Sequence, residues 1–237
     1  MRKANLFLFA IFACFVANTH AQQTAPTPEP KANARPTPAP EPKANSRPTP
    51  AVTAPAEPFD KADVKTMAAQ CVALDTEAGL IEAEMYPEHA PESVRNFLNL
   101  AATGLLDGTS FDRVVPKFVI QGGNMWSREG GTVTREIGQR ARRTIPDEPN
   151  KILHERGIVS MARADEPNTA TTNFFILVAE AAYLNNKFAA FGKVTKGMEV
   201  VDAINKANVT EEKPEKPVRI RKASVAKCTG TQAPSPA

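Results

Sequence analysis

Histidine and cysteine are scarce in this sequence, which holds only three of each among 237 residues. None of them cluster at the spacing of a zinc site, so a zinc enzyme is not expected, although scattered carboxylates leave another metal open. Charge of one sign is also lacking, because 29 basic side chains and 26 acidic ones leave a net charge of +3. A balance this even does not indicate nucleic acid or an anionic membrane as a partner.

Three kinds of motif are missing as well. Gly122-Gly123 lacks the lysine and the helix context of a phosphate-binding loop. Ser93 and Ser160 have no histidine and aspartate arrangement that indicates nucleophilic catalysis. The basic run 135–143 has no aromatic side chains between its charges on which bases could stack. We predict a solvated loop there, and we expect no cofactor, metal or nucleic acid.

The N-terminal residues have the pattern of a secretory signal peptide. Arg2 and Lys3 give a short positive segment, residues 6–17 are an almost unbroken apolar run, and Ala21 offers a small residue for cleavage. The run is too short for a comfortable membrane span. We therefore predict a signal peptide over residues 1–21 and a periplasmic or secreted protein.

Two alternatives stay open for this segment. It could remain uncleaved as an N-terminal anchor, or a lipid could be attached at Cys14. Residues 11–14 loosely resemble a lipobox, but Phe12 is bulky for that motif and apolar residues continue beyond the cysteine. Cleavage remains the leading prediction.

A proline-rich segment follows. Eleven of the 21 prolines lie between residues 22 and 58, and the sequence PEPKANARPTP at 28–38 returns as PEPKANSRPTP at 40–50. Proline fixes φ and removes an amide donor, and the segment is too polar to form a core. We predict a disordered, semi-stiff polyproline II spacer over 22–63. A docking site for a proline-recognising partner and a self-substrate of the domain are the alternatives.

Residues 64–230 have the pattern of one β-rich domain, with a disordered tail over 231–237. Alternating apolar and polar residues over 80–85 are typical of a half-buried strand. Helices are predicted from Pro91 to Gly104 and over 197–207, where apolar residues recur at helical spacing. Further strands are expected at 71–74, 111–115, 118–121, 157–162, 173–178, 188–194 and 218–227. Many short strands with two helices favour a barrel or a sandwich.

Four blocks of the sequence resemble the cyclophilin family. They occur in the family's order, as FDRVVPKFVIQGGN at 111–124, GIVSMAR at 157–163, Asn168-Thr169 with NFFI at 173–176, and FGKV at 191–194. The resemblance runs from about residue 70 to 228. The residues MAR at 161–163 and the short loops are similar to those of bacterial members. It implies a mainly β fold, namely a closed eight-stranded antiparallel barrel capped by two α-helices.

The resemblance also implies a peptidyl-prolyl cis/trans isomerase that works without a metal or cofactor. Its substrates would be proline-containing peptides and unfolded proteins, and a monomer is the family's default. The reaction itself needs neither a metal nor a cofactor. Resonance keeps the prolyl amide planar, and the barrier to rotation about it is ~20 kcal/mol. The catalyst has to bind the twisted amide better than either planar form.

Arg113 matches the family's catalytic arginine and would stabilise the lone pair that twisting localises on the prolyl nitrogen. Phe118 matches a wall of the proline pocket, and Gln121 matches the residue that positions the arginine and bonds the substrate backbone. The resemblance implies a further set of substrate-binding residues: Val119, Ala162, Arg163, Asn173, Phe175, Tyr183, Leu184 and Phe188. At Ala162 and Arg163 the main chain is expected to pair with the peptide, so side-chain identity should matter less.

Four of these positions depart from the family's usual residues. Val119 replaces methionine and Asn173 replaces glutamine, so we expect a slightly wider pocket and an amide of shorter reach. Tyr183 stands where many eukaryotic members have tryptophan, and Phe188 where many have histidine. Both remain aromatic, but we expect weak cyclosporin binding. Trp126, the only tryptophan, is expected to pack locally and not to line the pocket.

Cleavage of the signal peptide would leave only Cys71 and Cys228. Two cysteines in an exported protein can pair. The resemblance places them at the same end of the first and last strands, which are antiparallel neighbours in the family. We hypothesise a disulfide between them, with two unpaired thiols as the alternative.

Two other functions stay open. A cyclophilin-like domain could hold proline-containing segments without turnover, although retention of Arg113, Phe118, Gln121 and Phe175 argues against this. The chain could instead be a holdase or envelope scaffold in which the proline-rich segment matters most. The leading prediction is an isomerase that assists the folding of exported proteins.

Overall fold

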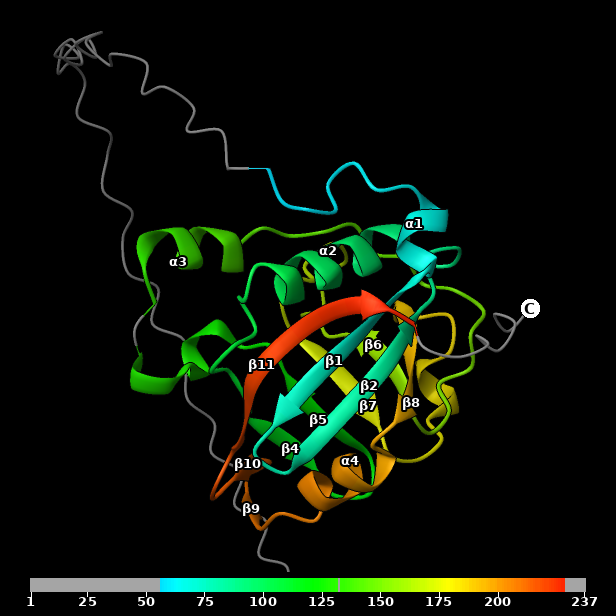
Figure 1. Cartoon of the computed structure of the whole chain (residues 1–237). Helices are drawn as coiled ribbons and strands as arrows, with labels where there is room; N and C mark the ends of the chain where they lie inside the picture. Colours follow the sequence, from blue (N-terminus) through cyan, green and yellow to red (C-terminus); the bar gives the residue numbers. More distant parts are fainter. Residues whose placement is uncertain (1–55, 132, 229–237) are drawn as a thin grey trace, which may run out of the picture. The chain divides into compact units, whose positions relative to one another are not determined.

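The computed structural model describes residues 56–131 and 133–228. The predicted signal peptide, the alternative of a lipid at Cys14, the proline-rich repeats and the tail over 231–237 lie outside these residues. The described residues form a barrel with helices at its ends (Figure 1). In this part of the chain, no helix has the length and apolar character needed to cross a membrane.

The barrel wall is one antiparallel sheet of nine strands in the order β3-β11-β1-β2-β8-β6-β7-β5-β4. Its strands are β1 (Gln70–Thr76), β2 (Gly79–Met85), β3 (Ser110–Phe111), β4 (Arg113–Val115), β5 (Val119–Gly122), β6 (Ile158–Met161), β7 (Phe174–Leu177), β8 (Ala190–Lys196) and β11 (Val218–Lys227). A separate hairpin consists of β9 (Val209–Thr210) and β10 (Lys213–Pro214). The first and last long strands are antiparallel neighbours, with Cys71 opposite Ala226.

The strand predicted over 111–115 is divided in two, so the sheet has nine strands and not eight. Ser110–Phe111 pairs with β11, whereas Arg113–Val115 pairs with β5. Asp112 between them accepts a hydrogen bond from Asn124 Nδ2 at 2.6 Å. A strand that joins the two edges of a strongly curved sheet has to change direction, and it does so at Asp112. The barrel is nearly closed through this residue, and the predicted mainly β fold is confirmed.

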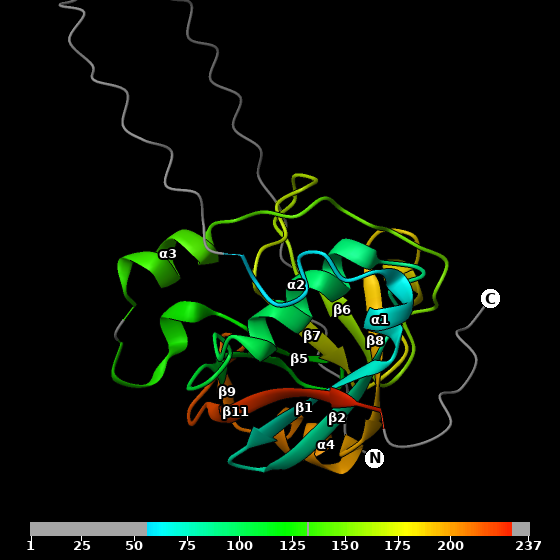
Figure 2. The same ribbon diagram turned by 45° about the horizontal axis from the view of Figure 1, so that its top comes forward.

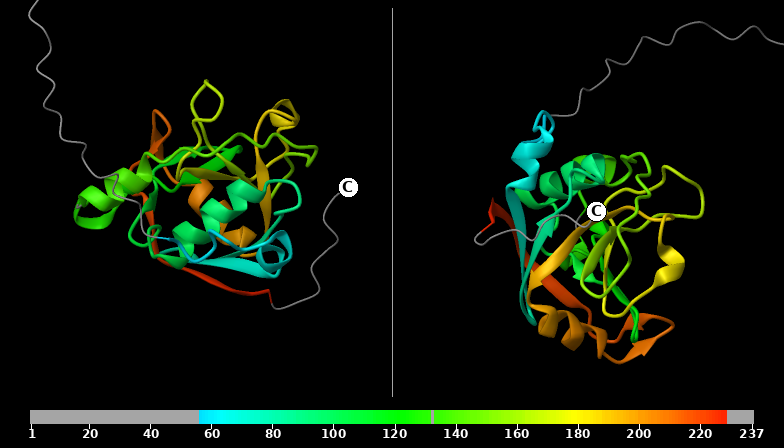
Figure 3. Two further views of the ribbon diagram at one scale, coloured as in Figure 1. Left: turned by 90° about the horizontal axis from the view of Figure 1, so that it is seen from above. Right: turned by 90° about the vertical axis from the view of Figure 1, so that its right-hand side faces the viewer.

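Two helices lie at opposite ends of the barrel. They are α2 (Pro91–Ala102) and α4 (Met198–Asn205), the two predicted from their apolar spacing (Figures 1 and 3). Phe97 of α2 and Val201 of α4 are fully buried. The rings of Phe97 and Phe174 meet edge to face with centroids 4.9 Å apart, so α2 packs directly into the barrel core.

Two short helices depart from the sequence prediction. α1 (Val64–Ala68) precedes β1, and α3 (Arg135–Ala141) occupies the basic run, so the prediction of a loop there is wrong. Thr134 caps α3 by accepting a hydrogen bond from the Ile137 N–H at 3.3 Å, and Ala141 is buried. A cap and one buried side hold a short helix that its charge pattern does not reveal. α3 lies on the same side of the barrel as α2 (Figure 2).

The first turn of α2 is capped from a distant part of the chain. Ala90 at the N-cap makes no side-chain hydrogen bond to this turn. The Glu148 carboxylate takes that role and accepts from the main-chain N–H groups of Glu92 and Ser93 at 2.9 and 2.8 Å. A negative charge is also favourable at a helix N-terminus. Glu148 thus fixes the long loop before β6 to the end of the barrel.

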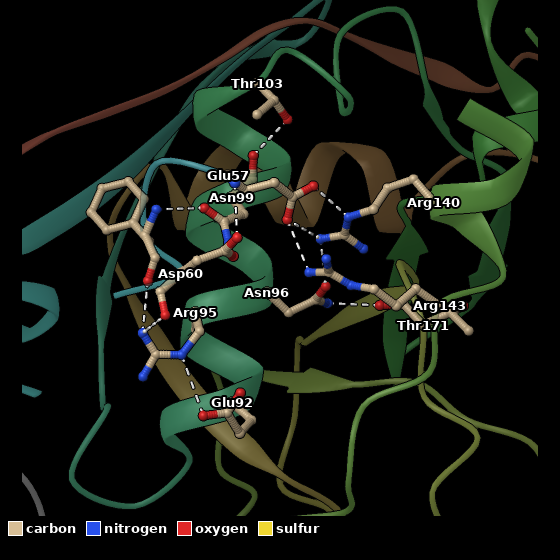
Figure 4. Close-up of polar contacts among 11 residues, drawn as sticks. Glu57, Asp60, Glu92, Arg95, Asn96, Asn99, Thr103, Arg140, Arg143 and Thr171 are labelled. Carbon is tan, nitrogen blue, oxygen red and sulfur yellow. Dashed lines mark hydrogen bonds and ion pairs between the residues drawn. The ribbon is translucent and has the colours of Figure 1, made fainter. Parts of the chain in front are cut away.

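The folded domain begins before residue 64, the boundary that composition predicts. The Phe59 N–H donates to Asn99 Oδ1 at 2.8 Å. Arg95 Nη1 donates to the carbonyls of Phe59 and Ala62 at 2.7 and 2.8 Å. Figure 4 shows contacts of this kind between the segment and α2. Most of the contacts that hold this segment to α2 are hydrogen bonds and ion pairs. Its composition is therefore polar and resembles that of a linker.

Glu57 ties the same segment to α3 and the loop after it. Its carboxylate pairs with Arg140 Nε at 2.6 Å and with Arg143 Nη2 at 2.9 Å (Figure 4). The side chains of Glu57 and Arg140 are each only 10% exposed. Arg140 Nη2 also donates to Asn96 Oδ1 of α2 at 2.9 Å. One buried ion pair therefore joins three parts of the domain.

Replacing Glu57 by glutamine is expected to lower the free energy of unfolding by about 3 kcal/mol, because Arg140 would stay buried without its counter-charge. Denaturant unfolding measures the change. Glu92→Gln is the matched control, since Glu92 is 45% exposed and pairs with Arg95 on the surface of α2. That loss should cost less than about 0.5 kcal/mol. Equal losses in the two variants would contradict a structural role for the buried pair.

Candidate active site

A cavity of about 200 Å³ lies on the barrel wall. Every predicted site residue except Asn173 lines it: Arg113, Phe118, Val119, Gln121, Ala162, Arg163, Phe175, Tyr183, Leu184 and Phe188. These residues are far apart in the sequence, so the fold brings them together. Leu184 and Tyr183 come from a short 3-10 helix, η3 (Ala182–Leu184), and most of the others from the strands or their ends.

Strand register sets the polar and apolar parts of the cavity side by side. Arg113 is opposite Gln121 in the pairing of β4 with β5, and Gln121 is opposite Phe175 in the pairing of β5 with β7. Directly opposite residues share one face of a sheet, so the three side chains form a row across the wall. Val119 lies two residues before Gln121 and faces the same side of β5. The row places a guanidinium and a phenyl ring at the same cavity.

The apolar part of the cavity is built from side chains that pack on one another. Val119, Phe175 and Leu184 are buried. The rings of Phe175 and Phe188 meet edge to face with centroids 6.0 Å apart, and those of Phe118 and Tyr183 lie 5.8 Å apart. A ligand in this cavity would contact mainly carbon atoms, which suits a small apolar ring.

Arg113 supplies a fixed positive charge beside these apolar walls. Its side chain is 41% exposed. Nη1 donates to Gln121 Oε1 at 3.1 Å, and Nε donates to Glu212 Oε2 at 2.8 Å. A guanidinium keeps its charge at any physiological pH and has a rigid planar set of donors. The arrangement can therefore stabilise a lone pair or partial negative charge on a bound ligand atom.

Asn173 is the predicted site residue that does not line this cavity. It lines a second cavity of about 230 Å³, which shares Arg113 and Gln121 with the first. Asn173 lies two residues before Phe175, directly before β7 begins, and it faces the same side of the wall as Phe175. Its Oδ1 is buried and has no hydrogen-bond partner among the described residues. A ligand that contacted Asn173 would therefore lie in the second cavity.

Ala162 and Arg163 follow β6, and the pairing of their main chain with a bound peptide stays a prediction. The Ala162 N–H donates to the Asn173 carbonyl at 2.9 Å, so it extends the β6–β7 pairing and a bound peptide has to use neighbouring groups. The Arg163 guanidinium lies over the Phe188 ring, 5.0 Å from its centre, and forms an ion pair with Asp147 at 3.2 Å. The Arg163 side chain is thus a wall of the cavity and supports Phe188.

Some residues around the site have no signal in the sequence. Glu212 at Arg113, Asp147 at Arg163 and His154 behind Phe175 all come from turns or loops and match no motif that the sequence offers. Trp126 is 54% exposed, and the Arg142 guanidinium lies 5.8 Å from its ring centre, away from the cavity. Among the described residues, no group of three or more His, Cys, Asp or Glu side chains could hold a metal ion.

His154 supports the back of one cavity wall. It is 1% exposed, and its ring stacks on Phe175 with centroids 6.4 Å apart. Its Nε2 lies 3.1 Å from Ser160 Oγ. Burial lowers the pKa of His154 below its ordinary value of 6.5, although a hydrogen bond with Asn185 opposes the shift. The imidazole is therefore neutral in the folded domain at neutral pH.

The domain is expected to lose stability as the pH falls below about 6.5. The unfolded chain binds a proton at the ordinary pKa of His154, whereas the folded domain binds it only at a lower pH, so protonation favours unfolding. The stabilisation from the neutral His154 imidazole is complete above the ordinary pKa. It is lost progressively as the pH falls toward the lower pKa of the folded state. Thermal midpoints measured from about pH 8 to pH 5 should fall in the wild type and less steeply in His154→Gln. Parallel slopes would contradict this assignment.

Comparisons with known proteins identify the family. The family model for cyclophilin type peptidyl-prolyl cis-trans isomerase/CLD matches residues 71–225. Peptidyl-prolyl cis-trans isomerase A of Dickeya dadantii is 38% identical over 170 residues, which cover 66% of this chain and 84% of that protein. A peptidyl-prolyl cis-trans isomerase of Schizosaccharomyces pombe is 39% identical over 156 residues, which cover 64% of this chain and 96% of that protein.

A solved structure has the same fold. The crystal structure of a cyclophilin type peptidyl-prolyl cis-trans isomerase of Cryptosporidium parvum, in the presence of the dipeptide Ala-Pro, superposes with a TM-score of 0.58. It is 28% identical and covers 67% of this chain and 99% of that chain. The matched range of the family model includes every predicted site residue from Arg113 to Phe188. The chain therefore belongs to the cyclophilin family and is a peptidyl-prolyl cis-trans isomerase.

Proposed function

We propose that this isomerase acts on proline-containing segments of unfolded or extended polypeptides, with the proline ring in the apolar cavity and Arg113 beside the prolyl nitrogen. The row of Arg113, Gln121 and Phe175 across three strands carries the proposal. It sets a guanidinium at the edge of a cavity whose other walls are largely apolar. Ala-Pro, which was present with the Cryptosporidium parvum protein, is a ligand of the proposed class.

In the proposed mechanism, the X–Pro amide bond rotates, and no covalent bond forms or breaks. Twisting the amide removes its resonance and leaves a lone pair on the prolyl nitrogen, to which Arg113 donates. This interaction is absent from either planar form, and it strengthens where apolar walls exclude water. Gln121 holds Nη1 of the arginine at 3.1 Å. Phe118, Phe175 and Leu184 grip the proline ring while the preceding carbonyl rotates.

The polypeptides on which it acts are proposed to be exported ones. The N-terminal pattern of Arg2, Lys3 and the apolar run 6–17 supports this. The structure joins Cys71 and Cys228 in a disulfide. This bond supports export as well, because disulfides persist in oxidising compartments. In such a compartment, newly arrived chains fold with slow X–Pro steps that last tens to hundreds of seconds without catalysis.

Two further expectations belong to this proposal. Cyclosporin should bind weakly, because Tyr183 and Phe188 replace the tryptophan and histidine of many eukaryotic members. Tyr183 is also 61% exposed, which leaves much of its ring outside the cavity. The mature protein is expected to be a monomer. Competition by cyclosporin in the peptide assay and a sedimentation measurement test the two expectations.

The test of the proposal is a rate measurement on residues 22–237. The protein should accelerate isomerisation of a short Ala-Pro peptide and also the slow refolding phase of a disulfide-containing exported protein. Acceleration of the peptide but not of refolding would reject long polypeptides as the substrates. Affinity for both substrates without acceleration would favour a binding module.

Two controls address the scaffold alternative and the site of action. Deletion of 22–55, which stops before Glu57 so that the domain stays intact, should leave peptide turnover unchanged if the chain is an isomerase. If the deletion variant kept full peptide turnover but no longer assisted the folding of exported proteins in cells, a scaffold would be favoured. Fractionation of cells that express the full chain should recover a protein that starts near residue 22 outside the cytoplasm, and an uncleaved cytoplasmic chain would reject export.

A further inference from the structure

The hairpin of β9 and β10 has an unusual turn. Thr210 is opposite Lys213 and Val209 is opposite Pro214, so Glu211 and Glu212 form a two-residue loop. Both glutamates have positive φ, at 50° and 65°. Turns that need positive φ at both central positions favour Asn-Gly, and a residue with a long side chain is strained there. The fold keeps a glutamate at a position where glycine or asparagine would be favourable.

Contacts with β4 hold this turn in place. The main-chain carbonyl of Glu212 accepts a hydrogen bond from the Val114 N–H at 2.8 Å. The neighbour of Val114 in the chain is Arg113, whose Nε donates to Glu212 Oε2 at 2.8 Å. The main-chain hydrogen bond to Val114 therefore holds Glu212 close to β4, within reach of the Arg113 guanidinium for its carboxylate. The residue contacts β4 at two consecutive positions.

Two acceptors together fix the plane of the Arg113 guanidinium. Glu212 accepts from Nε, and Gln121 accepts from Nη1. Because the guanidinium is planar and rigid, two bonds at different nitrogens determine its orientation. Nη2 makes no hydrogen bond with any residue in 56–131 or 133–228. Both of its N–H groups, together with the second N–H group of Nη1, remain available to a bound substrate.

We propose that Glu212 is a positioning residue, which orients Arg113 for its interaction with the prolyl nitrogen. The inference rests on the role of Arg113 proposed above. Gln121 alone would leave the guanidinium free to turn about its long side chain, since the group is 41% exposed. The Glu212 carboxylate removes that freedom before the substrate binds, which lowers the entropy cost of reaching the twisted state. The strained turn is the structural means of presenting it.

Steady-state kinetics of Glu212→Ala on an Ala-Pro peptide test the proposal. kcat should fall about tenfold, with KM within about twofold of the wild type, because the substrate still binds in the apolar cavity. Glu212→Gln keeps an oxygen that accepts from Nε and should recover most of the loss. The pair is exposed at both ends, so the thermal midpoint should move by no more than about 4 °C.

Glu211→Ala is the matched control. Glu211 occupies the same turn with the same charge and a similar φ, but the structure pairs Glu212, not Glu211, with the guanidinium. Its kcat should stay within about twofold of the wild type. A fall equal to that of Glu212→Ala would overturn the proposal, because the cause would then be the net charge or the fold of the hairpin.

A double-mutant cycle separates this inference from the proposed role of Arg113. If Glu212 acts through Arg113, Glu212→Ala should cost nothing further in an Arg113→Ala background. An additional tenfold loss there would overturn the positioning role. Full activity of Arg113→Ala would overturn the proposed mechanism itself, whereas an inactive Arg113→Ala with a fully active Glu212→Ala would overturn only this inference.

Discussion

Arg113→Ala is expected to lower kcat/KM for an Ala-Pro peptide by about 100-fold, the usual loss when one fixed donor to the transition state is removed. The change removes a side chain that lines the apolar cavity and donates to both Gln121 and Glu212. Within the described residues, the other arginine at the cavity is Arg163, whose fork is directed to Asp147 and nearby carbonyls. It therefore offers no replacement for the lost donor.

The measurement is peptide isomerisation with wild type, Arg113→Ala and Arg113→Lys. Lysine keeps the charge but loses the planar fork, so its activity should lie between the other two. Arg156→Ala is the matched control, because Arg156 forms an exposed ion pair with Asp202 and does not line the cavity. Wild-type activity in a folded Arg113→Ala variant would reject the mechanism.

Replacing Cys71 and Cys228 by serine is expected to lower the free energy of unfolding by up to about 5 kcal/mol. The structure joins the two cysteines, with their Cα atoms 4.9 Å apart and a sequence separation of 157 residues. In the chain-entropy model, a cross-link that closes so long a loop restricts the unfolded chain strongly. The native contacts should change little, because β1 and β11 stay paired through Cys71 and Ala226.

Denaturant unfolding of the wild type, the double serine variant and the reduced wild type measures this effect. The reduced protein and the serine variant should unfold at the same, lower denaturant concentration. A thiol titration of denatured mature protein should find no free thiol before reduction. Two free thiols, or equal stability of all three samples, would contradict the disulfide and its role.

The strands of the barrel wall and the two long helices could be predicted from the sequence because their buried positions follow the periods of local structure, whereas the hairpin of β9 and β10 was not predicted. Ile81, Ala83 and Met85 alternate along β2, and all three are buried. Phe97 and Val201 lie on apolar helix faces for the same reason. The cavity residues could be predicted because they stand in blocks such as 111–124, which resemble the family.

The remaining features depend on partners that are distant in the sequence. α3 is attached to the domain through the ion pair of Arg140 with Glu57, and the cap of α2 depends on Glu148, which lies 55 residues from Ser93. Glu212 reaches Arg113 across 99 residues, from a turn whose residues do not match the usual turn preferences. No local period records such pairings. The break at Asp112 is similar, because it arises from closure of the whole barrel.

The adjacency of β1 and β11 also sets the order in which this domain can be completed. β1 ends at Thr76, and its partner begins only at Val218, so most of the chain has to be present before the two can meet. Such a high contact order slows folding, since a long loop has to close before its contacts reward it. In a chain that folds as it is synthesised from the N-terminus, one edge of β1 would stay unpaired until β11 had been synthesised. The bond between Cys71 and Cys228 could then form only after β11 had paired with β1.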